Sequence, residues 1–472
     1  MILPGPRRRL CGSLLALLAL LASSRLPAQG PEAADLVVRG GTVVTMDGDR
    51  RVLENGAVAI RGDRIVEVGT ADALSRRYRA RRAIDAAGRI VLPGLINTHT
   101  HASMVLFRGL ADDLPLQEWL EKAIFPAEAK NVTREFVRWG TRLACLEMIQ
   151  AGTTTFVDMY YFESAAADET AKAGMRGILG QALIDFPAPD YKTWPEAVAA
   201  TERFLRAWKG HTLITPAVAP HATYTVSPDH LKEAHALAVR EDAPLVIHVA
   251  ETQAESQTIR SKYAATPVGF LEGLGFLDES VLIAHAIWVD DADIATLARR
   301  KVGVAHCPQS NMKLASGTSP VPALLSAQIA VGLGTDGAAS NNDLDLWEEM
   351  DTAAKLHKLV SMKADALPAR DSVAMATIGG ARAIHRDRDL GSLEPGKLAD
   401  LIVVRINTAH QTPLYDVYSH LVYATKASDV ETVVVGGRVL MENRQVKTLD
   451  APAVLAKARQ YRDQIRKSVG RP

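Results

Sequence analysis

Eight short apolar segments, each followed by a stretch of helical character, constrain the fold of this chain more than any other feature. They alternate between about residues 91 and 385 and have the length and the flanking turn residues of strands. Such alternation predicts βα units around a parallel sheet, and eight units favour a closed, TIM-like (β/α)8 barrel over an open, doubly wound sheet. The predicted strands are residues 91–99, 154–159, 176–184, 213–221, 244–248, 281–285, 302–306 and 330–335.

Several of the later predicted strands end in an ionisable side chain. His221, His248, His285, His306 and Asp336 stand at these ends or directly after them. Active sites of such barrels form at the carboxyl ends of the strands, so these side chains are candidates for one site. For a single histidine the simpler interpretation is a core residue with satisfied hydrogen bonds, but several at equivalent ends favour a shared function.

The segment PGLINTHTH, residues 93–101, covers the end of the first predicted barrel strand and the two residues after it. Side chains two residues apart on a strand share one face, so His99 and His101 would converge on one point. His248 and Asp336 add a third nitrogen and an oxygen from strands five and eight, and the first and last strands of a barrel are neighbours. Imidazole and carboxylate are the usual zinc ligands. The sequence therefore predicts one divalent metal ion per subunit at His99, His101, His248 and Asp336, with zinc as first choice and iron or manganese as alternatives.

Glu251 follows His248 by three residues, just past the strand end. There it could reach a water activated by the metal without being a ligand, and a carboxyl so placed can carry protons to a leaving group. The alternative interpretation is a carboxylate favoured by the dipole of a helix N-terminus.

Both ends of the chain contain short strand-like segments broken by turn residues. Near the N-terminus they predict a small antiparallel sheet of residues 35–38, 42–46, 57–61 and 64–68, and near the C-terminus further strands at 398–405 and 430–440. We expect a small β-sandwich built from both ends, a barrel between its halves and a charged C-terminal helix outside. The expected boundaries are 33–91, 92–387, 388–449 and 450–472.

The first 28 residues have the order of charge, apolar run and small residues that is typical of a secretory signal peptide. The apolar run, residues 10–22, is shorter than the roughly 20 residues that cross a bilayer, so an uncleaved anchor is the second choice. We expect export to the periplasm or the exterior without a stable membrane anchor. Lys plus Arg equals Asp plus Glu at 54 each, so overall charge does not predict a nucleic-acid partner. Cys145 and Cys307 are predicted to be ordinary buried thiols.

These residues stand within motifs that resemble the amidohydrolase superfamily, over residues 35 to about 446. Within it the chain looks like the 5-methylthioadenosine/S-adenosylhomocysteine deaminase group, which is related to triazine hydrolases and guanine deaminases. The motifs are Asp85-x-x-Gly88 before PGLINTHTH, GTTT at 152–155, APH at 219–221, IHVAET at 247–252, AH at 284–285, HCPQSNMKLASG at 306–317 and GLGTDGAASNN at 332–342.

The resemblance implies roles around the metal. His99, His101, His248 and Asp336 would be its ligands, and Asp336 would also accept the proton of the attacking water. Glu251 would protonate the purine ring and then move protons to the departing ammonia. His285 would orient the water or the substrate.

The resemblance also implies substrate contacts. Glu128 would hold the ribose hydroxyls and His221 would touch the substrate, although a structural role suits both, since Glu128 opens a helix after Pro126. Similar enzymes carry arginines for a homocysteine carboxylate where Gln181 and Trp194 stand here, so an apolar thioether tail fits better.

The implied reaction is metal-dependent deamination of an adenosine-type nucleoside, with a small molecule as the partner. The substrate would be 5-methylthioadenosine, S-adenosylhomocysteine or adenosine, converted to the inosine analogue and ammonia. Alternatives are hydrolysis of another amino- or chloro-substituted heterocycle, such as an s-triazine or guanine, and an exported metal-binding protein without catalysis. A homo-oligomer is left open.

Overall fold

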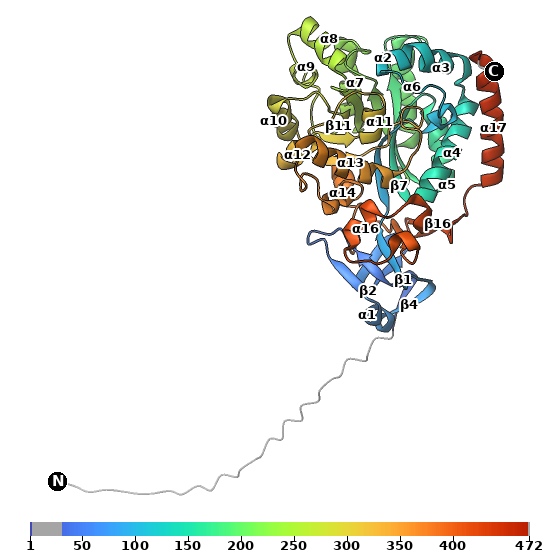
Figure 1. The fold of residues 1–472 in the computed structure, drawn as a ribbon, viewed down its shortest axis with the longest axis vertical. Helices are drawn as coiled ribbons and strands as arrows, with labels where there is room; N and C mark the ends of the chain where they lie inside the picture. Colours follow the sequence, from blue (N-terminus) through green and yellow to red (C-terminus); the bar gives the residue numbers. More distant parts are fainter. Residues whose placement is uncertain (2–30, 471–472) are drawn as a thin grey trace.

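The computed structural model describes residues 1 and 31–470 and contains two sheets, one wound into a barrel and one beside it (Figure 1). The segment predicted as a signal peptide lies, apart from Met1, outside the described residues. All eight predicted barrel strands are confirmed, and they pair in parallel and in chain order. They are β6 (Leu95–Thr100), β7 (Thr153–Tyr160), β8 (Arg176–Leu183), β9 (Ile214–Pro220), β10 (Leu245–Val249), β11 (Val281–His285), β12 (Gly303–His306) and β13 (Val331–Leu333).

Hydrogen bonds beyond the strand ladder join β6 to the segment that follows β13. Asn97 Nδ2 donates to Thr335 Oγ1 at 2.8 Å, and the backbone N–H of Asp336 donates to the carbonyl of His99 at 3.0 Å. The barrel is therefore closed at the point where the first and last strands meet, which places Asp336 beside the histidines of β6.

Helices after the strands cover the outside of the barrel, as the alternating pattern predicts (Figure 1). The longer ones are α4 (Arg134–Ala151), α5 (Glu163–Ala173), α6 (Trp194–Trp208), α7 (Pro228–Glu241), α8 (Gln253–Tyr263), α10 (Asp291–Arg300) and α13 (Leu346–Ser361). The shorter ones are α9 (Pro267–Gly273), α11 (Pro308–Lys313), α12 (Val321–Ser326), α14 (Ala369–Met375) and α15 (Ile378–Ala383). The capping threonines 133, 193 and 252 each accept a backbone N–H in the first turn of α4, α6 and α8, which fixes where these helices begin.

Residues 102–131, called the cover segment below, connect β6 to α4 by short helical turns. These are η1 (Ala102–Phe107), α2 (Leu116–Trp119), the π-helical turn η2 (Leu120–Ile124) and α3 (Phe125–Asn131). Their inward side chains, among them Trp119 and Phe125, line the pocket described below.

The second sheet takes strands from both ends of the chain, as predicted. Its nine strands are β1 (Glu32–Val44), β2 (Val52–Arg61), β3 (Arg64–Thr70), β4 (Tyr78–Asp85), β5 (Arg89–Pro93), β14 (Leu401–Arg405), β15 (Val430–Val435), β16 (Arg438–Glu442) and β17 (Gln445–Val446). The predicted N-terminal strands pair antiparallel, β1 with β2 and β2 with β3, and β1 also pairs in parallel with β4 and β5, which were not predicted as part of this sheet. Helix α1 (Ala71–Arg77) precedes β4 and provides the crossover that a parallel neighbour requires.

Gly94 is the joint between the two sheets. Residues 91–93, predicted as part of the first barrel strand, belong to β5, and β6 begins after Gly94. A Cβ at Gly94 would lie 2.2 Å from Thr154 Oγ1, so only glycine fits where the chain crosses from one sheet to the other.

The remaining elements lie beside the barrel and the second sheet. They are α16 (Val417–Tyr423), the turns η3 (Ala409–Gln411) and η4 (Ala427–Asp429), and α17 (Ala451–Ser468). Helix α17 packs outside α4, where Tyr461 meets Phe136 edge-on with ring centroids 5.5 Å apart. Cys145 and Cys307 are buried free thiols, as predicted. Of the helices in the described part of the chain, none is both long and apolar enough to cross a membrane.

Candidate active site

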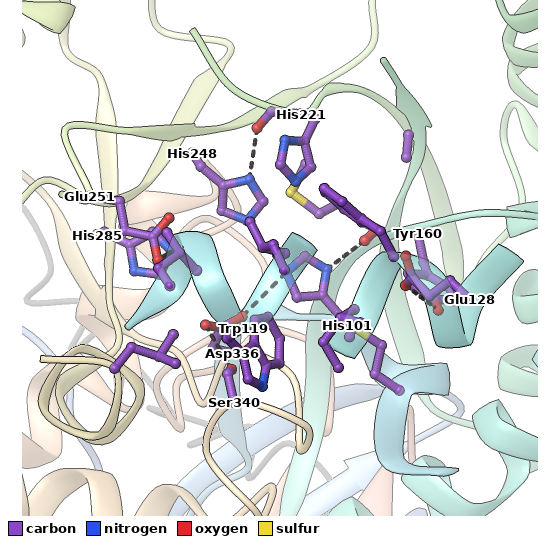
Figure 2. Close-up of a pocket in the computed structure, with 18 of the residues that line it drawn as sticks. His101, Trp119, Glu128, Tyr160, His221, His248, Glu251, His285, Asp336 and Ser340 are labelled. Carbon is purple, nitrogen blue, oxygen red and sulfur yellow. Dashed lines mark hydrogen bonds and ion pairs between the residues drawn. The ribbon is translucent and has the colours of Figure 1, made fainter. Parts of the chain in front are cut away.

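The predicted site residues meet in one pocket at the carboxyl ends of the barrel strands (Figure 2). His99 is fully buried beside this pocket and stacks edge-on against His101 and His248. The others line it directly: His101, Glu128, His221, His248, Glu251, His285 and Asp336.

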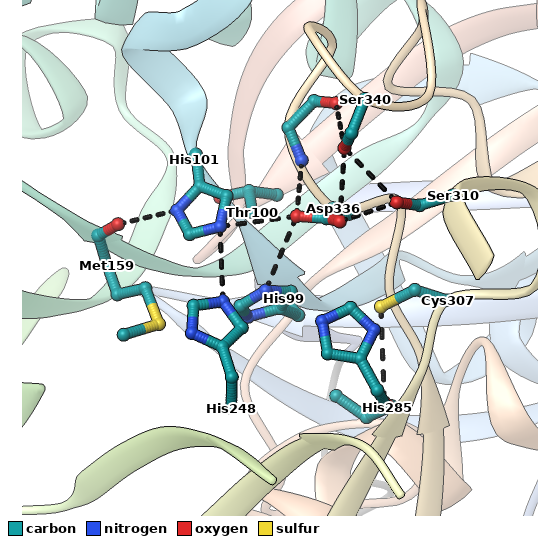
Figure 3. Close-up of polar contacts among 12 residues, drawn as sticks. His99, Thr100, His101, Met159, His248, His285, Cys307, Ser310, Asp336 and Ser340 are labelled. Carbon is teal, nitrogen blue, oxygen red and sulfur yellow. Dashed lines mark hydrogen bonds and ion pairs between the residues drawn. The ribbon is translucent and has the colours of Figure 1, made fainter. Parts of the chain in front are cut away.

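His101 and His248 are each oriented by a backbone carbonyl. His101 Nδ1 lies 2.7 Å from the carbonyl oxygen of Met159, and His248 Nδ1 lies 2.7 Å from that of His221. Because a carbonyl only accepts, each Nδ1 carries a hydrogen and donates it. The two Nε2 atoms then face each other at 3.3 Å, which is the orientation that metal-binding histidines have (Figure 3).

The same point is surrounded by His99 and Asp336. Asp336 Oδ1 lies 3.5 Å from His99 Nε2 and 3.2 Å from His101 Nε2. His99 is completely buried, yet neither of its ring nitrogens has a hydrogen-bond partner within the described part of the chain. Buried polar atoms are rarely left unpaired, so these imidazole nitrogens and the carboxylate oxygen beside them fit a divalent cation as ligands.

His285 also lies close to this group. One possible ligand atom from each of His99, His285 and Asp336 lies within 4.8 Å of the other two. The same is true of the group His99, His101 and His248. The resemblance implies that His285 orients the water or the substrate and is not a metal ligand, and the geometry is compatible with both roles.

The protonation of the group suits a cation. Burial lowers the pKa of His99 to about 4 and holds that of His248 well below its ordinary value, so both imidazoles are neutral. Burial opposes the charge of Asp336, but the nearby imidazoles of His101 and His99 outweigh it and hold its pKa well below the ordinary value. The pKa of His101 is lowered by burial, and Asp336 outweighs that effect and raises it to about 9. The carboxylate thus attracts one positive charge to this point.

Two serines that sequence reasoning missed hold Asp336 in place. Ser310 Oγ donates to Asp336 Oδ2 at 2.6 Å, and Ser340 Oγ donates to the same atom at 3.1 Å (Figure 3). Both stand in motifs quoted above, but their partners are visible only in the fold.

Asp158 is another missed residue, and it supports the backbone on either side of His101. Its Oδ1 accepts hydrogen bonds from Thr100 Oγ1 at 2.9 Å and from the backbone N–H of Ala102 at 2.7 Å, on either side of His101. Nothing in the sequence distinguishes this aspartate from the other carboxylates of the chain.

Glu251 and His285 lie together next to the metal-ligand group. Glu251 is 5% exposed, and its Oε1 lies 3.8 Å from His285 Nε2. Burial raises the pKa of Glu251 well above its ordinary value, and the charges of Asp336 and Glu255 add to the effect. His285 Nδ1 pairs with Asn311 Oδ1 at 2.9 Å, another contact that the sequence did not predict. His285 and Asp336 have left-handed backbone, with φ of +74° and +60°, a strained conformation found often at functional sites.

Glu128 lies on the opposite side of the pocket from Glu251 (Figure 2). Tyr160 Oη, which sequence reasoning missed, donates to Glu128 Oε1 at 2.6 Å. Burial raises the pKa of Glu128 to about 7, although the bond from Tyr160 opposes the rise. His221 Nδ1 pairs with Thr225 Oγ1 at 2.9 Å, and burial lowers the pKa of His221 to about 3, so its ring is neutral.

Besides His99, three residues singled out from the sequence do not line the pocket. His306 Nε2 faces His357 Nε2 at 3.1 Å, so this strand-end histidine is a core residue, although its buried Nδ1 has no hydrogen-bond partner among the described residues. Gln181 donates to Asp190 Oδ2 at 2.9 Å, and Trp194 donates to Glu233 Oε2 at 2.7 Å. Gln181 and Trp194 therefore use their polar atoms on other partners.

The comparisons with known proteins agree with this geometry. The model of the amidohydrolase family matches residues 90–440, more than half of the chain. This chain belongs to the amidohydrolase family. A short stretch of this amidohydrolase, residues 56–80, also matches the bacterial imidazolonepropionase-like composite domain. The resemblance inferred from the motifs is confirmed.

Curated relatives of this amidohydrolase span almost its whole described length. A 5-methylthioadenosine/S-adenosylhomocysteine deaminase of Syntrophobacter fumaroxidans is 49% identical over 430 residues, 91% of this chain and 98% of the relative. A 5'-deoxyadenosine deaminase of Methanosarcina acetivorans is 45% identical over 443 residues, 92% of this chain and 98% of the relative.

Solved structures similar to this amidohydrolase include two with zinc. An adenosine deaminase from Xanthomonas campestris with bound zinc has a TM-score of 0.91 and 39% identity, covering 93% of this chain and all of that one. An atrazine chlorohydrolase from Arthrobacter aurescens complexed with zinc has a TM-score of 0.84 and 26% identity, covering 90% of this chain and 99% of that one. This amidohydrolase is a hydrolase acting on C–N bonds.

Proposed function

We propose that this amidohydrolase uses one divalent metal ion to deaminate an adenosine-type nucleoside, giving the inosine analogue and ammonia. The candidate substrates are 5-methylthioadenosine, S-adenosylhomocysteine and adenosine. The observation that carries the proposal is a single pocket with the three-histidine, one-aspartate group and Glu251 at one end and Glu128 at the other. The names of the relatives at 45–49% identity support the same reaction.

His99, His101, His248 and Asp336 would hold the metal ion. Zinc is the first choice because neutral imidazole and carboxylate suit it, and because two similar structures contain it. When bound, a divalent cation supplies a water molecule of lowered pKa as the nucleophile.

The residues of the chain would then move the protons. Asp336, ionised and held by Ser310, accepts the proton that the attacking water loses. Glu251, whose pKa burial raises well above its ordinary value, donates its proton to the ring nitrogen beside the reacting carbon. It then takes the hydroxyl proton of the addition intermediate and passes it to the departing ammonia, and the proton held by Asp336 restores Glu251. The hydrogen bond with Asn311 fixes His285, whose Nε2 lies 3.8 Å from Glu251 and can orient the water or the leaving group.

The opposite end would bind the sugar. The Glu128 carboxyl, held by Tyr160, can accept hydrogen bonds from the two ribose hydroxyls, and His221 faces the purine from the wall between the two ends. A ring without a sugar would leave Glu128 without these partners.

Ammonia release by the purified, zinc-loaded protein tests the proposal. Adenosine, 5-methylthioadenosine and S-adenosylhomocysteine are assayed beside guanine and an s-triazine, with the metal content measured in the same preparation. Turnover of a nucleoside and not of the bare heterocycles is expected. Turnover of a triazine or guanine alone would favour the alternative, to which the atrazine chlorohydrolase structure lends support.

We also propose that residues 1–28 direct export. Fractionation of cells expressing the full chain, or the chain from residue 29, would locate the enzyme. Equal retention of both in the cytoplasm would contradict export.

A further inference from the structure

The two ends of the pocket determine which way a nucleoside lies in it (Figure 2). Glu251, His285 and Asp336 lie at the reacting end, where the ring carbon that loses its amino group must sit. Glu128 and Tyr160 lie at the other end, called the far end below. A nucleoside bound for deamination therefore directs its ribose and its 5' substituent toward the far end.

Apolar and aromatic side chains surround this far end. Ile124 and Phe125 come from the cover segment just before Glu128, and Tyr161 follows Tyr160 after β7. The ring of Phe125 meets that of Phe186 edge-on with centroids 5.5 Å apart. Because Phe186 is 40% exposed, this pair of rings leads from the pocket to the surface.

Of the described residues that line the pocket, Glu128 is the one with a carboxyl group at the far end. Among the described residues, no lysine or arginine lines the pocket. The polar atoms of Gln181 and Trp194 are engaged with Asp190 and Glu233. A carboxylate brought to the far end would lose water without gaining a cation, and would lie near another acidic group.

On the basis of the function proposed above, we propose that the pocket selects adenosine-type nucleosides whose 5' substituent lacks a carboxylate over those with a carboxylate-bearing tail. Methylthio, hydroxyl and hydrogen substituents belong to the first class, and S-adenosylhomocysteine to the second. Phe125, Tyr161 and Glu128 are the specificity-determining residues. A thioether sulfur packs favourably against aromatic rings, so 5-methylthioadenosine should have the highest kcat/KM among these nucleosides.

The test compares kcat/KM of the metal-loaded full chain for 5-methylthioadenosine, 5'-deoxyadenosine, adenosine and S-adenosylhomocysteine. Decarboxylated S-adenosylhomocysteine is the fifth compound, because it keeps the length and the ammonium group of the tail and lacks only the carboxylate. We expect kcat/KM for S-adenosylhomocysteine to be at least about tenfold below that for 5-methylthioadenosine, with most of the loss recovered by decarboxylation.

Two results with the native chain would overturn the inference. The first is a kcat/KM for S-adenosylhomocysteine equal to or above that for 5-methylthioadenosine. The second is an equally low kcat/KM for the decarboxylated compound, since the carboxylate would then not be what excludes the tail. If none of the five nucleosides is deaminated, the proposed function itself fails, which is a different outcome from a wrong order among them.

Variants at Phe186 test where the tail emerges. Phe186→Arg places a guanidinium beside Phe125 and should lower the ratio of kcat/KM for 5-methylthioadenosine to that for S-adenosylhomocysteine at least about fivefold. Phe186→Leu is the matched control and should leave this ratio within about twofold of the parent's. No effect of the arginine would contradict the assigned direction of the tail.

Lys262 provides the opposing test. It lines a neighbouring surface groove together with Phe186 and Tyr224. If Lys262→Met lowered kcat/KM for S-adenosylhomocysteine alone, the tail would already have a cation there and the inference would be wrong; unchanged ratios would support it.

Discussion

Replacing Glu251 by glutamine tests the chemistry assigned to the pocket most directly. The glutamate is almost fully buried, and its Oε1 lies 3.8 Å from His285 Nε2. Burial raises the pKa of Glu251 well above its ordinary value, and the charges of Asp336 and Glu255 add to the rise, which favours the protonated carboxyl. Glu251→Gln therefore removes a transferable proton while keeping the size and the neutral charge of the side chain.

The expected loss follows from the two steps that the carboxyl serves. A positioned acid or base contributes about 10²–10⁴-fold to a rate. Here one group would protonate the ring and later the departing ammonia, so we expect kcat to fall by about 10³–10⁴-fold, or about 4–5 kcal/mol in the barrier. KM and metal content should change little, because none of the four predicted ligands is altered.

The assay is ammonia release at saturating nucleoside, with metal measured on the same protein. Glu349→Gln is the matched control: Glu349 is also buried, burial raises its pKa well above the ordinary value, and it accepts a hydrogen bond from Asn341 at 2.8 Å away from the pocket lining. The control should keep kcat within about threefold of the parent. A Glu251→Gln protein that keeps its metal and loses less than about tenfold in kcat would refute the reasoning.

Three further predictions concern the metal and the far end. His248→Ala should lower the metal bound per chain and abolish activity, and chelation of the parent should do the same until zinc is restored; full metal occupancy in the variant, by elemental analysis, would contradict the ligand set. Ser310→Ala removes the 2.6 Å bond to Asp336 and should weaken metal binding about 10–100-fold in a chelator competition, with an unchanged affinity counting against its role. Burial raises the pKa of Glu128 from 4.5 to about 7, so the folded chain holds a proton that the unfolded chain releases, and stability should fall by up to about 3 kcal/mol as pH rises through this window. Glu128→Gln should remove that part of the pH dependence, measured as the change in Tm between pH 5 and 7.5. The same change in Tm in the parent and the variant would contradict it.

The barrel could be predicted because its strands are buried on both faces. Short continuous apolar runs bounded by turn residues are typical of strands buried on both faces, and the predicted and observed strands differ by only a few residues at their ends. Strand β4 was missed because it alternates irregularly and most of its side chains, such as Arg79 and Arg82, are exposed or half-buried. The cover segment was missed because its turns are too short to show a helical period.

The site could be predicted as far as strand ends determine it. That rule placed His248, His285 and Asp336 correctly in the pocket but also selected His306, which pairs instead with His357 from α13. The supporting contacts could not be predicted, because each joins residues far apart in the chain. Ser310 is 26 residues from Asp336, and no local pattern records that the two will meet.

The glycines of the quoted motifs show that the metal site depends on the same close strand contact that closes the barrel. A Cβ at Gly332 would lie 2.3 Å from Thr98 Cγ2, and one at Gly334 would lie 2.9 Å from the Cβ and the backbone nitrogen of His99. Only small residues on the last strand let it approach β6 closely enough for the backbone N–H of Asp336 to reach the carbonyl of His99. The motifs therefore contain both the donors and the residues that bring the donors together. A substitution that opened this seam would separate Asp336 from the histidines, and the metal site would be lost even with all four ligands still present.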